Sequence, residues 1–348
     1  MKMSNYQNIS VAIVGYGYWG PNLMRNFINS PWFNVQYLVE PNPEKIMGFV
    51  DSNPSVEVVE NLDSVLADPT LQCVVISSPP NTHFQIAKQS LKAGKHILIE
   101  KPFTTSYKDA KELVDLAELN GLKLFVDYTF LYNGAIESIK NTLSDKMRFG
   151  ELLYLDSVRI NLGIFQGDVN VVWDLACHDI SIFNYWLEER PVSVQAIGID
   201  GLNNGIENIA YIHLKYTNKF AQINCSWSSP VKIRQMLIGG TKQAILYNDI
   251  EPTDKVKIYD KGVVFNKESD RKELLQDYRT GEINIPKYDT TEALSKVVEA
   301  FYRNIQLDEE SKSSGKKALE VSVILECIQK SILLNGKEIT IDWEQLGV

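Results

Sequence analysis

Two short stretches of this sequence combine residue types that can hold or move protons. The first is Glu100-Lys101-Pro102, in which a lysine follows a run of apolar residues. A lysine ammonium at the end of a buried strand can hydrogen-bond an oxygen of a bound molecule and stabilise the negative charge that develops on it. The alternative is a surface Glu-Lys pair ahead of a loop, and the position after a buried strand favours the first interpretation.

The second stretch is 173–179, in which Asp174 and His178 are four residues apart. On a helix this spacing places both side chains on one face, so the carboxylate can orient the imidazole and favour its charged form. A histidine that titrates near neutrality is a suitable base for a hydroxyl proton. The spacing alone favours the alternative, an aspartate that caps a helix start beside an ordinary surface histidine.

A glycine-rich turn near the start of the sequence is suited to binding a dinucleotide. The apolar run 11–14 is followed directly by Gly15-Tyr16-Gly17-Tyr18-Trp19-Gly20. The three glycines permit a tight bend, a close approach of the backbone to a pyrophosphate, and close packing of the next helix on the strand. The first N–H groups of that helix then point at the phosphates.

Glu40 ends a second predicted strand, 35–40, twenty residues after Gly20. A carboxylate at this distance accepts hydrogen bonds from the adenosine ribose. Its charge would repel a 2′-phosphate, so NAD is favoured over NADP, although Lys45 keeps NADP open. His83 could line the cofactor site or belong to a capping turn. The predicted cofactor residues are Gly15, Tyr16, Gly17, Tyr18, Trp19, Gly20, Glu40, Ser77, Ser78, Pro79, Asn81, His83, Glu100 and Lys101.

The elements that position these residues alternate between strand and helix as far as Asp127. Further strands are expected at 56–59, 73–77, 96–100 and 122–127, with helices at 82–93, capped by Asn81, and at 106–120. This alternation predicts an α/β fold with a doubly wound, parallel Rossmann sheet, in which ligands bind at the carboxyl ends of the strands. We expect a Rossmann domain over residues 1–127.

From residue 128 onward, short strands separated by turns predict an α+β domain over residues 128–348 with a large open antiparallel sheet. Its bare face should pair subunits into a homodimer or homotetramer. A charged stretch at 267–287 reads as an exposed loop or arm. Strands are expected at 151–159, 192–200, 208–216, 220–228, 234–238 and 243–247, a hairpin at 256–259 and 263–265, and helices at 174–187, 291–306 and 316–335.

The composition places the protein among soluble globular proteins. Hydrophobic residues make up 44% of the 348 residues and charged residues 23%, which is typical of that class. A net charge of −9 argues against a nucleic-acid partner. We expect no signal peptide or membrane span and therefore a cytoplasmic location. Four scattered cysteines predict neither a metal site nor a disulfide framework.

Taken together, the glycine turn, Glu100-Lys101-Pro102 and the Asp174/His178 pair resemble the Gfo/Idh/MocA oxidoreductases, and the resemblance covers nearly the whole chain. It implies that Lys101, His178 and Asp174 form the catalytic group. The stretches 128–133, 161–166 and 168–170 look like the branch found with nucleotide-sugar pathways. Departures at 171–173 and at Cys177 reshape the pocket wall and bear on the substrate rather than on the reaction type.

The resemblance implies NAD-dependent oxidation of a secondary hydroxyl, at C3 of a nucleotide-linked sugar such as a UDP-N-acetylhexosamine. The alternatives are a free-sugar or cyclitol dehydrogenase, an NADPH-dependent ketosugar reductase, and a non-catalytic NAD-sensing regulator. A regulator would need none of the three catalytic side chains. For the aromatic residues, packing in a core or interface is the default alternative to substrate binding. The predicted substrate-binding residues are Tyr128, Tyr132, Asn161, Trp173, Asp174 and His178.

Overall fold

The protein is described by a computed structural model that covers residues 8–163, 165, 167–260, 262–264, 277–279 and 281–348. The contacts between Cα atoms divide these residues into two compact units. One unit holds the described residues up to Tyr132, with Thr291–Val323 and Val348, and the other holds those of Asn133–Thr290 and Ile324–Gly347. Among the described helices, none combines the length and the apolar character that crossing a membrane requires.

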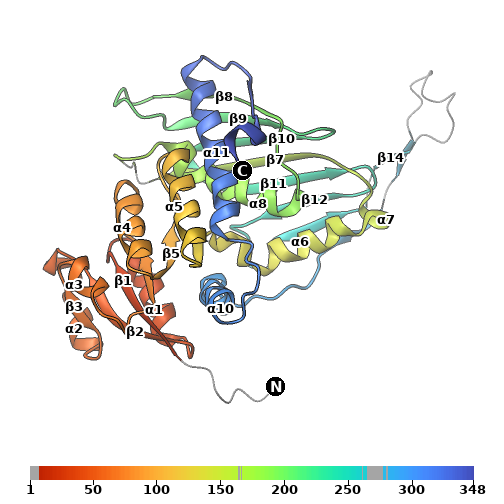
Figure 1. The fold of residues 1–348 in the computed structure, drawn as a ribbon. Helices are drawn as coiled ribbons and strands as arrows, with labels where there is room; N and C mark the ends of the chain where they lie inside the picture. Colours follow the sequence, from red (N-terminus) through yellow and green to blue (C-terminus); the bar gives the residue numbers. More distant parts are fainter. Residues whose placement is uncertain (1–7, 164, 166, 261, 265–276, 280) are drawn as a thin grey trace. The chain divides into compact units, whose positions relative to one another are not determined.

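The first unit is built on a six-stranded parallel sheet with the strand order β3-β2-β1-β4-β5-β6 (Figure 1). Residues of β1, β4 and β5 are almost completely buried, as expected for strands covered on both faces. The chain reverses its direction of travel across the sheet between β1 and β4, so a crevice for ligands opens at their carboxyl ends. The strands are β1 (Ile9–Val14), β2 (Phe33–Val39), β3 (Glu57–Val59), β4 (Cys73–Ile76), β5 (His96–Glu100) and β6 (Leu124–Asp127).

Helices connect these strands and pack in pairs against the sheet. Helix α4 lies beside α5, and α1 lies beside α10. The predicted N-cap at Asn81 is wrong, because α4 begins at Pro80 and Pro79 occupies the cap position. The helices of this part are α1 (Gly20–Asn29), η1 (Pro43–Ile46), α2 (Phe49–Ser52), α3 (Leu62–Leu66), α4 (Pro80–Lys92), α5 (Tyr107–Leu119) and η2 (Thr129–Tyr132).

Helix α10 (Ala293–Gln306), although it is near the end of the sequence, packs within the first unit. The Phe301 ring stacks on Phe33 with 5.9 Å between ring centroids. Arg25 of α1 donates hydrogen bonds to both carboxyl oxygens of Glu292, just ahead of α10, at 2.6 and 3.0 Å. Helix α11 (Gly315–Leu333) follows. The predicted domain boundary between residues 127 and 128 stays a prediction.

The second unit is built on a nine-stranded sheet that is mixed rather than purely antiparallel. Strand β10 runs parallel to β7, whereas the other described pairs of this sheet are antiparallel. Its order is β16-β13-β12-β11-β7-β10-β9-β8-β17. The strands are β7 (Leu152–Leu162), β8 (Ser193–Ile199), β9 (Ile209–Lys215), β10 (Phe220–Ser226), β11 (Ser228–Gly240), β12 (Ala244–Asn248), β13 (Val256–Tyr259), β16 (Ile283–Asn284) and β17 (Ile339–Thr340).

Helices cover one face of this sheet. Helix α6 (Gly134–Ser144), which the sequence patterns did not reveal, packs on α8 (Cys177–Leu187). The Trp186 indole of α8 donates a hydrogen bond to the carbonyl oxygen of Ile136 at 3.0 Å, which joins the two helices. Two more short helices are α7 (Lys146–Phe149) and α12 (Trp343–Leu346).

The hairpin predicted at 256–259 and 263–265 is wrong. Strand β13 pairs with β16, whereas β14 (Gly262–Val264) pairs with β15 (Asp277–Arg279) in a separate two-stranded sheet. The reason is that a tight turn predicts a reversal of the chain but does not decide which edges pair. Residues 267–276 and 280 of the predicted arm lie outside the described residues.

Candidate active site

The glycine turn has the close backbone approaches that its spacing predicts. Gly15 has a φ of +95°, and a Cβ atom there would lie 2.8 Å from the Ser78 nitrogen. A Cβ on Gly20 would lie 2.6 Å from the Gly15 carbonyl oxygen, so helix α1 can start against the strand only at a glycine. Around Gly17, nothing lies within 4 Å of the Cβ position. Such a turn can admit a pyrophosphate beside the N-terminus of α1.

Glu40 lies directly after β2 and is only 4% exposed. Its carboxylate accepts hydrogen bonds from the backbone N–H groups of Tyr16, at 2.8 Å, and Asn42, at 3.0 Å. The Lys45 ammonium lies 3.6 Å away. Because a carboxylate has about four acceptor positions, Glu40 can still accept a hydrogen bond from a ribose hydroxyl. The residues present therefore fit the adenosine half of NAD.

The turn after β4 lies against the glycine turn. The Ser77 hydroxyl donates a hydrogen bond to the Gly15 carbonyl oxygen at 2.8 Å. The hydroxyls of Ser78 and Thr82 are 2.7 Å apart, which ties the loop to the first turn of α4. Pro79 and Asn81 are exposed. These contacts shape the rim of the predicted cofactor site.

His83 is fully buried and joins two strand-end loops. Its Nδ1 atom lies 3.0 Å from the Pro102 carbonyl oxygen, and its Nε2 atom lies 3.0 Å from the Ser78 carbonyl oxygen. A neutral ring can donate to one of these oxygens, and an imidazolium can donate to both. His83 thereby holds the loop after β4 against the turn that contains Lys101.

Lys101 follows β5 directly and is half-buried. Its backbone N–H donates a hydrogen bond to Glu100 at 3.2 Å. Glu100 is paired in register with Asp127 of the neighbouring strand β6. Burial raises the pKa of both carboxyl groups. The structure therefore places two buried carboxyl groups at the base of the turn that carries the lysine.

Asp174 and His178 lie where the chain changes from a π-helix to an α-helix. The predicted helix 174–187 begins earlier, with the π-helix η3 (Val172–Ala176), and continues as α8. The Asn170 carboxamide oxygen accepts the N–H group of Val172 at 3.1 Å and so caps the start. Short π-helical segments are rare and frequently occur at functional sites.

Trp227, which the sequence analysis did not single out, contacts the predicted catalytic aspartate. Its indole N–H donates a hydrogen bond to the Asp174 carboxylate at 2.9 Å, and its side chain is 1% exposed. The Phe165 ring meets the indole edge to face at 5.8 Å, and a Cβ on Gly163 would lie 2.9 Å from that indole. The two partners are 53 residues apart in the sequence. A contact between residues this far apart leaves no pattern in the sequence. The one available signal is that a buried tryptophan needs an acceptor for its N–H group.

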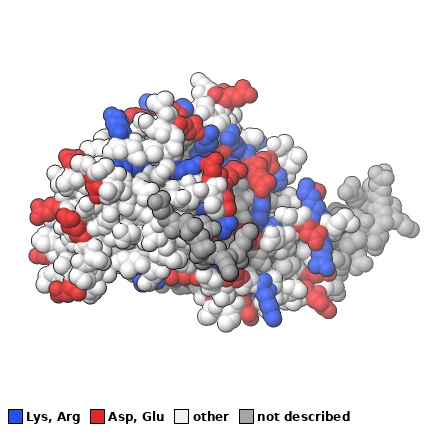
Figure 2. Space-filling model, turned by 60° about the horizontal axis from the view of Figure 1, so that its bottom comes forward, with Lys and Arg blue, Asp and Glu red and all other residues white. Residues whose placement is uncertain are grey.

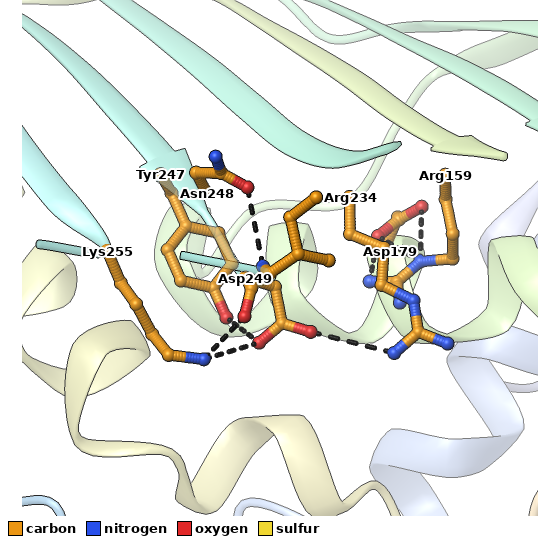
Figure 3. Close-up of polar contacts among 8 residues, drawn as sticks. Arg159, Asp179, Arg234, Tyr247, Asn248, Asp249 and Lys255 are labelled. Atoms are coloured by element: carbon orange, nitrogen blue, oxygen red, sulfur yellow. Dashed lines mark hydrogen bonds and ion pairs between the residues drawn. The ribbon is translucent and has the colours of Figure 1, made fainter. Parts of the chain in front are cut away.

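The first turns of α8 are anchored to the sheet by a buried ion pair (Figure 3). The Arg159 guanidinium of β7 contacts both oxygens of Asp179 at 2.7 to 3.2 Å, and the two residues are 3% and 0% exposed. Burial alone would lower the pKa of Arg159, but Asp179 raises it above its ordinary value. Because Asp179 follows His178 directly, this pair fixes where the histidine lies on the sheet.

A second charged cluster lies beside this pair in Figure 3. The Asp249 carboxylate accepts a hydrogen bond from the Tyr247 hydroxyl at 2.9 Å and lies 3.3 Å from Lys255 and 3.6 Å from Arg234. Burial would raise the pKa of Asp249, but Lys255 and the other neighbours lower it below its usual value. Burial raises the pKa of Tyr247 far above its usual range, and Asp249 adds to the effect.

The predicted substrate-binding aromatic residues are mostly buried. Tyr128 is 2% exposed, Tyr132 is 8% exposed and Trp173 is 8% exposed. The Tyr132 hydroxyl lies 3.2 Å from that of Ser311, and its ring stacks on Phe125. These contacts support the packing interpretation for Tyr132. Exposed aromatic surface in the predicted cofactor site comes instead from Tyr18 and Trp19, which are 83% and 36% exposed. Asn161 is half-buried.

The strand order of the first unit, with a glycine turn at its switch point, defines a dinucleotide-binding Rossmann protein. The family described as "Oxidoreductase family, NAD-binding Rossmann fold" matches residues 9–128, and the "GFO/IDH/MocA C-terminal domain" matches residues 165–246. These two matches cover more than half of the chain. The protein belongs to the Gfo/Idh/MocA oxidoreductase family, as its motifs predicted.

Several relatives are similar to parts of the chain. An uncharacterised oxidoreductase of Schizosaccharomyces pombe is 43% identical over 30% of this chain, and the aligned part spans only 28% of the relative. A UDP-N-acetylglucosamine 3-dehydrogenase of Acidithiobacillus ferrooxidans is 32% identical over 40% of this chain and 42% of its own length. The crystal structure of GenD2 from gentamicin A biosynthesis, in complex with NAD, aligns with a TM-score of 0.82 at 18% identity, over 98% of this chain and 99% of GenD2.

Proposed function

We propose that the protein is an NAD-dependent dehydrogenase that oxidises a secondary hydroxyl of a nucleotide-linked sugar at C3, for which a UDP-N-acetylhexosamine is the candidate. The observation that carries the proposal is the combination of an NAD cradle with Lys101 at the end of β5 and the Asp174/His178 pair at the start of α8. The lysine belongs to the first unit and the pair to the second. Their convergence on one substrate is part of the proposal.

Each side chain has a defined role in this reaction. His178 takes the hydroxyl proton as the carbon–oxygen double bond forms. Lys101 donates a hydrogen bond to the same oxygen and stabilises its developing negative charge. Asp174, held by Trp227, orients the imidazole. When bound, NAD accepts the hydride that leaves the carbon, so the products are a ketosugar, NADH and one proton.

The cofactor and substrate preferences rest on separate observations. The buried Glu40 carboxylate would meet the 2′-phosphate of NADP with a like charge, which supports NAD. The 3-dehydrogenase of Acidithiobacillus ferrooxidans supports a nucleotide sugar. Figure 2 shows acidic and basic side chains interspersed over the face that it draws, which suits a small-molecule substrate better than a nucleic acid.

The proposal predicts reduction of NAD by a nucleotide sugar. The purified protein is mixed with NAD or NADP and with UDP- and dTDP-linked sugars, free sugars or cyclitols, and the absorbance of the reduced cofactor is followed. We expect the largest kcat/KM with NAD and a UDP-N-acetylhexosamine. The same sugar deoxygenated at C3 is the matched control and should give no reduction. Reduction with free sugars or cyclitols alone would contradict the nucleotide-sugar assignment.

We also propose that the chain forms a homodimer or homotetramer through the face of the nine-stranded sheet that faces away from α6 and α8. On β8 and β9, alternate residues are exposed, and several of them are large and apolar. Ile197 is 57% exposed and Tyr211, its partner in the sheet register, is 45% exposed. Apolar side chains in contact across neighbouring strands form a surface that a second copy can cover.

Charge on the β8 and β9 part of this face should separate the subunits. Sedimentation equilibrium should give a dimer or tetramer for the wild type and a mass at least halved for Ile197→Asp/Tyr211→Glu. The control is Met147→Glu, because Met147 is an exposed apolar residue on α7, away from these strands. A wild type that sediments as a monomer would overturn this proposal.

A further inference from the structure

We propose that Glu100 and Asp127 share one proton and act as a positioning pair for Lys101, so that the two carboxyl groups together carry a single negative charge beside the ammonium. The pair lies at the carboxyl ends of β5 and β6, where Glu100 and Asp127 are register partners. The positioning role of the pair in catalysis rests on the proposed function of Lys101. The shared proton itself is a property of the protein without substrate or cofactor.

Each of the two carboxyl groups has one oxygen that accepts a hydrogen bond and one that does not. Glu100 Oε2 accepts the Lys101 backbone N–H at 3.2 Å, and Asp127 Oδ1 accepts the Thr129 hydroxyl at 2.7 Å. The other two oxygens, Glu100 Oε1 and Asp127 Oδ2, are buried and have no donor among the described residues. A proton between these two oxygens satisfies both at once, whereas two ionised groups would leave like charges in contact.

The proton belongs on Glu100. Glu100 is 8% exposed and Asp127 is 0% exposed, so both pay a desolvation penalty when charged. Asp127 accepts the shorter of the two hydrogen bonds, from the Thr129 hydroxyl at 2.7 Å, whereas Glu100 accepts the Lys101 backbone N–H at 3.2 Å. The Thr129 hydroxyl thereby stabilises Asp127 as the carboxylate and leaves the proton to Glu100.

The charged neighbours of the pair explain what it does. Lys101 is the cation that partly offsets the rise that burial causes in the pKa of both carboxyl groups. Burial raises the pKa of Tyr132, which faces Asp127, to about 12, so this tyrosine stays neutral. His83 contacts the same turn through the Pro102 carbonyl. One negative charge keeps the Lys101 ammonium protonated, whereas a second one would hold the ammonium against the carboxylates and away from a substrate oxygen.

Infrared spectroscopy of the protein alone tests for the shared proton. With carboxyl groups of glutamate labelled with ¹³C, the difference spectrum between wild type and Glu100→Gln at pH 7 should show the C=O stretch of one protonated glutamic acid. In Asp127→Asn this band should be lost, because the new amide donates to Glu100 and keeps it ionised. In Asp127→Leu it should stay. The surface variant Asp115→Asn should change nothing.

The charge on Lys101 provides the second readout. Competitive acetylation with acetic anhydride, followed by peptide mass spectrometry, gives the pH at which Lys101 loses its proton. We expect this pH to fall by about one unit in Asp127→Leu, which removes the negative charge, and to stay close to the wild-type value in Asp127→Asn. A wild-type spectrum without a protonated Glu100, or the same Lys101 titration in all three proteins, would overturn the inference. Neither result depends on finding the substrate.

Discussion

Replacing Lys101 by methionine is expected to lower kcat/KM by about a hundredfold to a thousandfold, because the variant cannot donate a hydrogen bond to the developing oxyanion. Methionine keeps most of the length and apolar stem of lysine, so the turn after β5 should retain its shape. The affinity for NAD, measured by isothermal titration, should stay close to that of the wild type. The change would then fall on the reaction and not on cofactor binding.

A matched control for this variant is Lys92→Met, which removes an exposed lysine from the last turn of α4. Its turnover should equal that of the wild type. If Lys101→Met also turned over at a nearly normal rate, Lys101 would have no catalytic role, and the oxyanion would have to be stabilised by another group. A loss of NAD affinity together with turnover would instead assign the lysine to the cofactor.

Breaking the buried Arg159–Asp179 pair should be the most destabilising of the changes considered. Asp179→Ala leaves the Arg159 guanidinium buried without its partner, and we expect the free energy of unfolding to fall by about 3–5 kcal/mol. The double variant Arg159→Met/Asp179→Leu removes both charges and should recover most of this loss. Guanidinium denaturation followed by circular dichroism measures both. Because α8 would lose its anchor, turnover by Asp179→Ala should fall as well.

The exposed pair of Arg303 and Glu309 is the control for burial. Its side chains are each 47% exposed, although Arg303 Nε lies 2.8 Å from Glu309. Glu309→Ala should therefore cost about 0–1 kcal/mol. A loss of the same size for Asp179→Ala would show that the Arg159–Asp179 pair does not anchor α8.

Much of the first unit could be predicted because its signals are local. The apolar run of β1, the glycine turn and the start of α1 follow one another within thirteen residues, and each restricts the next. The parallel sheet follows from the alternation of strands and helices. Strand pairing in the second unit was harder to predict. An alternation of apolar and polar residues indicates a strand but does not show which other strand it pairs with. The parallel contact between β10 and β7 is an example.

In the candidate site, too, residues marked by local motifs could be predicted, whereas contacts between distant parts of the sequence could not. Glu40, Lys101, Asp174 and His178 could be predicted as candidates because motif spacing and strand ends mark them. Trp227 was missed because its partner Asp174 is 53 residues away. The π-helix at Asp174 was missed as well, because periodicity does not distinguish an α-helical turn from a π-helical one.

The amino-acid order alone determined the dinucleotide turn, the acid after β2 and the residue types available for proton transfer, because each depends on neighbours in the chain. Only the folded chain decided which buried groups meet: Trp227 with Asp174, Arg159 with Asp179, and Glu100 with Asp127. The physical reason is that charge and hydrogen bonding in a low-dielectric interior depend on distance in space, which strand pairing and helix packing set.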